Sequence, residues 1–280
     1  MNIPVPILIP TYNRYEITKK CIFNLLNGTF KDILIILCDS NSTDKTSELV
    51  ELSDKIKYLN VGKDSWYSAA INKGVDFITQ FNRSNFVLIL NDDIETPSNL
   101  VEQLLIKTIN KKNCIISPLQ ELGDLNFLGV VYKGYFKLPK IILNDDNKII
   151  EKNVDSTNGS CLLVPIDVFN KKIYFNNLSC PHYYSDTEFQ IRALKLGYQT
   201  VAFSDIKIVH GRPTNVLSKL NISNLFTFIG SPVLFKAYFK FGQTLFGNKY
   251  KFIFFGFYYH LNYLIHSSKA IKTLMKNQIK

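Results

Sequence analysis

Two adjacent carboxylates, Asp92 and Asp93, directly follow an apolar run, Phe86 to Leu90, that predicts a buried strand. Like charges at the end of a hydrophobic strand repel each other and lose hydration, so the pair needs a counter-charge. A hard divalent cation such as Mg²⁺ or Mn²⁺, which binds carboxylate and phosphate oxygens, would supply it. The alternative is a solvated turn, because Thr96-Pro97-Ser98 is typical of a helix start.

Polar clusters also follow two earlier apolar runs. Thr11 to Arg14 comes after Pro6 to Pro10, and Asp39 to Asp44 comes after Ile33 to Cys38. Apolar runs that alternate with amphipathic helices indicate an α/β fold with a parallel sheet covered on both faces. Ligands bind such sheets at the carboxyl ends of the strands, so we expect the three polar clusters to converge on one crevice.

The regular alternation loosens from about residue 113. The pattern from Phe127 to Leu143 predicts a β-ribbon, and short strands are predicted at 161–164 and 200–203. Between these two strands, a helix is predicted from about residue 187 to 196, closed by Gly197. We expect this half of the chain to frame an acceptor site.

Charge is distributed unevenly along the 280 residues, whose formal net charge is +10. Residues 206–280 hold 11 Lys or Arg and no acid, against 22 basic and 23 acidic residues before them.

The five cysteines have no CxxC spacing and mostly lie in apolar surroundings, which predicts reduced thiols in a cytosolic protein. The N-terminal residues resemble no signal peptide, in line with that expectation.

The basic tail is also aromatic, with 15 Phe or Tyr between Phe226 and Tyr263. Its longest apolar stretch, 252–265, is shorter than the ~20 residues of a transmembrane helix. Aromatic residues with lysines and no acids favour amphipathic helices on an anionic membrane surface. The alternative is a helical cap that packs its aromatic side chains on the domain. Nucleic-acid binding ranks low, because no RNP, helix-turn-helix or zinc signature accompanies the tail.

In order and spacing, the polar clusters resemble the motifs of inverting family-2 glycosyltransferases of the GT-A fold, especially bacterial enzymes that build surface polysaccharides such as capsule and lipopolysaccharide. The motifs are, in chain order, Pro10 to Arg14; Asp39, Ser42 and Asp44; Gly62, Ala70, Asn72 and Gly74; Asn91-Asp92-Asp93; Ser185-Asp186-Thr187-Glu188 with Arg192 and Gly197; and His210. Asn91, Ser185 and Glu188 depart from the residues usual in the family.

The resemblance covers about residues 4–212 and implies a Rossmann-like, mostly parallel sheet flanked by helices. On this basis, residues 1–212 form the GT-A domain, with a nucleotide-sugar half (1–112) and an acceptor half (113–212). Residues 213–280 would be a helical, aromatic and basic extension that associates with the membrane. We expect a peripheral protein on the cytoplasmic side of the inner membrane, with a nucleotide-diphosphate sugar and a glycan or lipid-linked acceptor as partners.

The resemblance also implies a role for each matched residue. Asp186 would be the general base, and Asp93 and His210 would bind Mn²⁺ or Mg²⁺. The donor nucleotide would contact Pro10, Thr11, Tyr12, Arg14, Asp39, Ser42, Asn72 and Asp92. The acceptor would contact Trp66, Gly159, Ser160, Ser185 and Glu188.

The chemistry of sugar transfer explains why such residues are needed. The incoming hydroxyl has a very high pKa, so a carboxylate must accept its proton as the new bond forms, which contributes a factor of about 10² to 10⁴. A divalent cation stabilises the departing diphosphate. Attack from the face opposite the leaving group inverts the anomeric configuration.

Each role has a structural alternative. Asp186 could cap the helix predicted from Thr187, His210 could be a hydrogen-bonded structural histidine, and Asp39 could form an Asx turn. Trp66 could pack in the core, and Gly159 with Ser160 could form a plain turn. Two rival functions also remain, a sugar nucleotidyltransferase and a catalytically degenerate assembly subunit. The sequence lacks the Gly-rich basic loop expected of the first.

Overall fold

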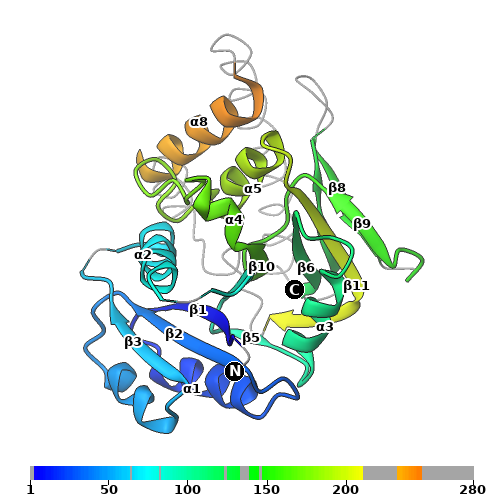
Figure 1. Ribbon diagram of the computed structural model, residues 1–280. Coiled ribbons are helices and arrows are strands. Elements are labelled where there is room, and N and C mark those ends of the chain that lie inside the picture. The colour runs from blue at the N-terminus through cyan, green and yellow to red at the C-terminus, as the bar shows by residue number, and fades with distance from the viewer. Residues whose placement is uncertain are drawn as a thin grey trace, which may run out of the picture.

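The computed structural model describes residues 3–210 and 232–247, except 64, 82, 123–124, 133–138 and 145–146. A central sheet carries helices on both faces (Figure 1). Of the predicted extension over 213–280, only 232–247 lies within the described residues, and there it is helical.

The first half of the sheet is parallel, as predicted. Its strands, in the spatial order β3-β2-β1-β4, are β3 (Ile56–Asn60), β2 (Ile33–Asp39), β1 (Val5–Thr11) and β4 (Phe86–Leu90). Side chains of a strand alternate between faces, and both faces are buried here, since Ile7, Leu8 and Ile9 are all 0% exposed. This double burial explains the unbroken apolar runs.

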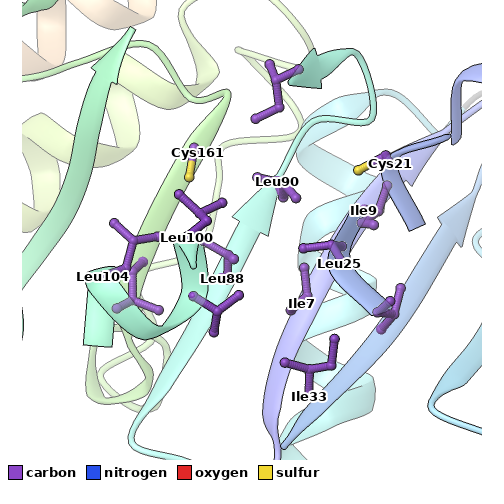
Figure 2. Close-up of a cluster of buried hydrophobic side chains, with 14 of the residues drawn as sticks. Ile7, Ile9, Cys21, Leu25, Ile33, Leu88, Leu90, Leu100, Leu104 and Cys161 are labelled. Atoms are coloured by element: carbon purple, nitrogen blue, oxygen red, sulfur yellow. The ribbon is translucent and has the colours of Figure 1, made fainter. Parts of the chain in front are cut away.

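Helices cover both faces. On one face lie α1 (Tyr15–Leu26), the 3₁₀ helix η1 (Lys45–Leu52) and α3 (Leu100–Lys107). On the other lie α2 (Tyr67–Thr79), α4 (Ile166–Asn170) and α5 (Ser185–Lys195). Figure 2 shows the first core, where Leu25 of α1 and Leu104 of α3 pack against Ile7 and Leu88 of the strands.

The second half of the sheet is mixed. Its strands are β5 (Ile94–Glu95), β6 (Cys114–Leu122), β7 (Leu125–Val131), β8 (Lys140–Leu143), β9 (Glu151–Val154), β10 (Cys161–Pro165) and β11 (Gln199–His210). β10 runs antiparallel between β4 and β6, and β6 pairs in parallel with β11. The antiparallel β7–β8 pair confirms the predicted ribbon.

β11 is longer than the strand predicted at 200–203. Polar Ser204 and Asp205 end the apolar pattern, but the strand passes them through an irregularity between Phe203 and Lys207 and continues to His210. There it pairs with β5, so that His210 lies opposite Ile94, the residue after Asp93. This pairing brings the predicted metal ligands together.

The last described element, α8 (Pro232–Phe246), packs beside α5 (Figure 1). No helix within the described part of the chain is long and apolar enough to cross a bilayer. All five cysteines are free thiols, as predicted.

Candidate active site

A cavity of about 420 Å³ lies at the carboxyl ends of β1, β2 and β4. Six residues predicted to bind donor or acceptor line it, namely Pro10, Thr11, Tyr12, Arg14, Trp66 and Asp92. Parallel strands end at the same edge of a sheet, which is why segments distant in sequence meet here. The predicted crevice is therefore present.

Asp92 is buried at the floor of this cavity. Its Oδ1 lies 2.9 Å from Arg14 Nη1, and its Oδ2 accepts hydrogen bonds from Thr18 Oγ1 at 2.8 Å and Thr11 Oγ1 at 3.3 Å. Burial raises the pKa of Asp92, whereas the charge of Arg14 and the Thr18 hydroxyl act in the opposite direction. Arg14 thus supplies part of the counter-charge that the sequence requires.

Asp93 keeps one oxygen available. Its Oδ2 pairs with Arg14 Nη2 at 3.1 Å, but its buried Oδ1 has no hydrogen-bond partner among the described residues. Buried polar atoms without partners are uncommon and call for an explanation such as a missing ion. An unpartnered carboxylate oxygen fits a hard divalent cation.

His210 is the second metal candidate. Its Nε2 lies 3.3 Å from Gln120 Oε1, and the charge of Asp93 reaches the ring. Burial lowers the pKa of His210, which favours the neutral ring that binds metals, while Asp93 acts in the opposite direction. No group of three His, Cys, Asp or Glu ligands occurs within the described residues. Asp93 and His210 fit a cation whose other ligands come from donor phosphates and water.

Asp186 lies in the first turn of α5, which begins at Ser185 and not near Thr187 as predicted. Its Oδ2 accepts a 2.6 Å hydrogen bond from the Gly159 N–H, and its Oδ1 accepts one of 2.8 Å from the Thr187 N–H. Burial raises the pKa of Asp186, and these hydrogen bonds oppose the shift. Tyr184 and not Asp186 is the N-cap residue, so Asp186 lies within the first turn, where its carboxylate binds the next N–H and has a raised pKa.

Gly159 connects Asp186 to the cavity wall. The Tyr67 hydroxyl, on a residue that lines the cavity, donates to the Gly159 carbonyl at 3.1 Å. A Cβ at position 159 would lie 2.7 Å from the Asp186 Cβ. Asp186 itself does not line the cavity, and Gly159 lies between it and the lining residue Tyr67.

Asp39 and Ser42 form a closed turn. Asp39 is buried and accepts hydrogen bonds from the Ser42 N–H at 2.9 Å, from Ser42 Oγ, and from Tyr58 Oη at 2.6 Å. This is the Asx turn that the sequence left open, reinforced by a tyrosine. Neither Asp39 nor Ser42 lines the cavity, although Ser40 between them does.

The side chains of four other predicted site residues form hydrogen bonds or ion pairs with other residues of the chain. Asn72 exchanges two hydrogen bonds with the Phe175 backbone, at 2.8 and 2.9 Å, and lines a separate cavity. Glu188 is fully buried and pairs with Arg192. Ser185 Oγ donates to the His182 carbonyl at 3.0 Å, and Ser160 Oγ donates to Asn158 Oδ1 at 2.9 Å. The structure does not bring these side chains to the cavity lined by Arg14.

Trp66 is 54% exposed, so the core alternative does not apply to it. Its ring tilts towards that of His182 at 5.9 Å between centroids, and both line the cavity. Sequence reasoning missed His182 and also Thr18. Thr18 lies four residues after Arg14, the N-cap residue of α1, and this spacing of about one helical turn could have revealed it.

Known proteins resemble this chain in sequence and in fold. The profile of glycosyl transferase family 2 matches residues 7–156, more than half of the chain. The chain is similar to a GalNAc(5)-diNAcBac-PP-undecaprenol β-1,3-glucosyltransferase of Campylobacter jejuni, with 34% identity over 36% of this chain and 33% of that protein. It thus spans about a third of that relative's length.

Two more comparisons extend over most of the chain. The low-salt glycan biosynthesis hexosyltransferase Agl10 of Haloferax volcanii is 25% identical over 75% of this chain and 67% of that protein. The crystal structure of GalNAc-T7 with UDP, GalNAc and Mn²⁺ superposes with a TM-score of 0.61 at 12% identity, covering 74% of this chain and 44% of that chain. The similarity to the GalNAc-T7 structure concerns the fold alone, and this fold is the predicted GT-A arrangement.

Proposed function

This chain belongs to glycosyl transferase family 2, and we propose that it transfers a sugar from a nucleotide-diphosphate donor, a UDP- or dTDP-sugar, to a glycan or lipid-linked acceptor. The observation that carries the proposal is a pair of carboxylates, neither of which lines the cavity but each of which contacts its surroundings. Asp93 pairs with the lining residue Arg14. Asp186 binds Gly159, whose carbonyl accepts a hydrogen bond from the lining residue Tyr67. Asp93 offers an oxygen that has no hydrogen-bond partner in the described part of the chain, and Asp186 is a desolvated carboxylate held by two backbone N–H groups.

Asp186 is the general base in this proposal. It accepts the proton of the acceptor hydroxyl while the oxygen of that hydroxyl attacks the anomeric carbon. The bond from this carbon to the diphosphate breaks on the opposite face, so the product has the inverted configuration. Burial raises the pKa of Asp186, which increases its affinity for the proton that it accepts.

The donor diphosphate binds at Arg14, Asp93 and His210. Arg14 carries a fork of N–H donors that suits phosphate oxygens. Asp93 and His210 hold Mn²⁺ or Mg²⁺, which when bound neutralises charge on the leaving diphosphate. Trp66 offers an exposed aromatic face on which a sugar ring stacks.

The composition of the tail and the name of one relative support a lipid-linked acceptor. The Campylobacter relative is a glucosyltransferase named for an undecaprenol-linked glycan. In the present chain, α8 exposes Lys236 and Phe239, and residues 206–280 lack acids. We infer peripheral binding to an anionic membrane on the cytoplasmic side, in the biosynthesis of a bacterial polysaccharide. Sedimentation of the full chain with vesicles of anionic lipid, but not with zwitterionic vesicles, is the expected result.

One assay separates the proposed transferase from its rivals. The full chain is incubated with UDP-, dTDP- or GDP-sugars, Mn²⁺ and a bacterial lipid extract as acceptor pool, and released nucleotide diphosphate is measured. A transferase releases it only when the extract is present. A nucleotidyltransferase instead releases pyrophosphate from a nucleoside triphosphate and a sugar 1-phosphate. An assembly subunit releases neither, and that outcome would overturn the proposal.

A further inference from the structure

Helix α8 makes a polar contact with the helix that carries Asp186. Thr244 Oγ1 in α8 donates a 2.9 Å hydrogen bond to Glu188 Oε1 in α5. Glu188 is 0% exposed and also receives Arg192 on both of its oxygens, at 2.8 to 2.9 Å. Buried carboxylates need every such partner, so the position of Thr244 and that of Glu188 are linked.

A second contact reaches the residue just before α5. Tyr184 adopts the left-handed conformation, with φ 56°, which a residue with a side chain holds only where its surroundings stabilise it. Its ring stacks on Phe241 of α8 at 5.2 Å between centroids, with 7° between the planes. The Tyr184 carbonyl accepts the Glu188 N–H at 2.8 Å, which closes the turn around Asp186.

Further bonds fix where α8 sits. The Lys195 ammonium donates to the Thr244 carbonyl, and Cys180 Sγ donates to the Ala237 carbonyl at 3.6 Å. Directional bonds of this kind define one docked position, whereas apolar packing alone tolerates sliding. Both ends of the turn that holds Asp186 are therefore held by α8.

We propose that α8 positions the catalytic base, with Thr244 as a positioning residue that acts through Glu188 on Asp186. The inference rests on the proposed function. It assigns Glu188 to this linkage in place of the acceptor contact expected from the sequence. A sub-ångström shift of a base changes the rate of the chemical step more than the affinity for donor, because the donor diphosphate is proposed to bind at Arg14, Asp93 and His210 and not at Asp186.

Three variants of the full chain test the linkage. Thr244→Val removes the hydroxyl at nearly constant volume, Thr244→Ser keeps it, and Gln243→Ala changes the neighbouring exposed residue. We expect Thr244→Val to lower kcat about tenfold with donor KM within about twofold, since it perturbs positioning and not donor binding. Thr244→Ser, which keeps the hydroxyl, and Gln243→Ala should both have the kcat of the wild type. Equal kcat in wild type and Thr244→Val would overturn the proposal.

A readout without activity keeps this test separate from that of the function. Amide hydrogen exchange of Glu188 is measured in the wild type and the same variants. Faster exchange in Thr244→Val but not in Gln243→Ala supports the linkage, and equal exchange in the wild type and Thr244→Val overturns it. A wild type that transfers no sugar overturns the proposed function by itself.

Discussion

The Asp186 Oδ2 accepts a 2.6 Å hydrogen bond from the backbone N–H of Gly159. Gly159 belongs to the loop before β10, and Asp186 belongs to α5, so the bond joins two segments 27 residues apart. With the Thr187 N–H on Oδ1, both carboxylate oxygens are oriented before any ligand binds. Such preorganisation reduces the reorganisation needed at the moment of proton transfer.

Replacement of the proposed base should abolish transfer without abolishing donor binding. In Asp186→Asn we expect kcat to fall by about 10² to 10⁴, because no group takes the acceptor proton. Nucleotide affinity should persist, since Asp186 is not among the residues proposed to hold the donor. Asp205→Asn, at an exposed acid paired with Lys107, is the control. Retention of more than a tenth of the activity in Asp186→Asn would rule out its role as the base.

A methyl group at Gly159 should displace the base. A Cβ there meets the Asp186 Cβ at 2.7 Å and the Tyr67 hydroxyl at 3.1 Å, so one of these side chains must move. We expect Gly159→Ala to lower kcat by about 10-fold to 100-fold. Gly28→Ala is a matched control, because its Cβ meets the Ser98 carbonyl at 2.8 Å, away from the cavity. Both variants should be less stable than the wild type. Only Gly159→Ala should also have a lower kcat when it is folded.

Transfer should depend on pH through Asp186. Burial raises its pKa above the ordinary value of 3.8, so the carboxylate is protonated, and transfer is lost, as pH falls through the raised value. Nearby His182, whose pKa burial lowers, gains charge in the acidic range and would hold the carboxylate ionised. In a pH profile of kcat, His182→Gln should therefore move the acidic limb to higher pH. An acidic limb at the pKa of an ordinary exposed carboxyl would contradict this account.

The strand-end clusters could be predicted from the sequence because their positions follow from a general property of parallel sheets. Thr11, Arg14 and Asp92 had to share one edge once their strands were recognised as parallel. The pairing of Arg14 with both Asp92 and Asp93 could not be predicted, since it depends on how loops far apart in sequence approach each other. The sequence accordingly left the whole counter-charge to a metal ion.

Motif matching was least informative for polar residues on helices. Asn72 fits a donor motif and Glu188 the motif of the base, but Asn72 bonds Phe175, 103 residues away, and Glu188 bonds Thr244, 56 residues away, in addition to the nearby Arg192. A motif gives the type and spacing of residues, whereas the face to which a helix turns them depends on tertiary packing. The antiparallel direction of β10 could not be predicted either, because a buried strand has the same apolar pattern in either direction.

Breaking the buried ion pair on α5 should destabilise the fold strongly, because one charge is then buried without its partner. Arg192→Met leaves Glu188 buried without its cation, and we expect the free energy of unfolding to fall by about 3 to 5 kcal/mol. Lys171→Met removes another i,i+4 pair, with Asp167, that is exposed on both sides and should change stability little. Urea denaturation of both variants measures the difference, and equal effects would mean that burial of Glu188 carries no penalty.

The most direct test of the proposed donor site is calorimetric titration of UDP, dTDP and GDP into the full chain with Mn²⁺, repeated with a chelator and with Asp93→Ala. We predict that one nucleotide binds tightly, and that binding collapses both with chelator and in the variant, because Asp93 Oδ1, which has no hydrogen-bond partner within the described residues, is proposed to hold the metal that carries the diphosphate. Absence of binding by all three nucleotides, or binding unchanged by chelator and by Asp93→Ala, would contradict the account.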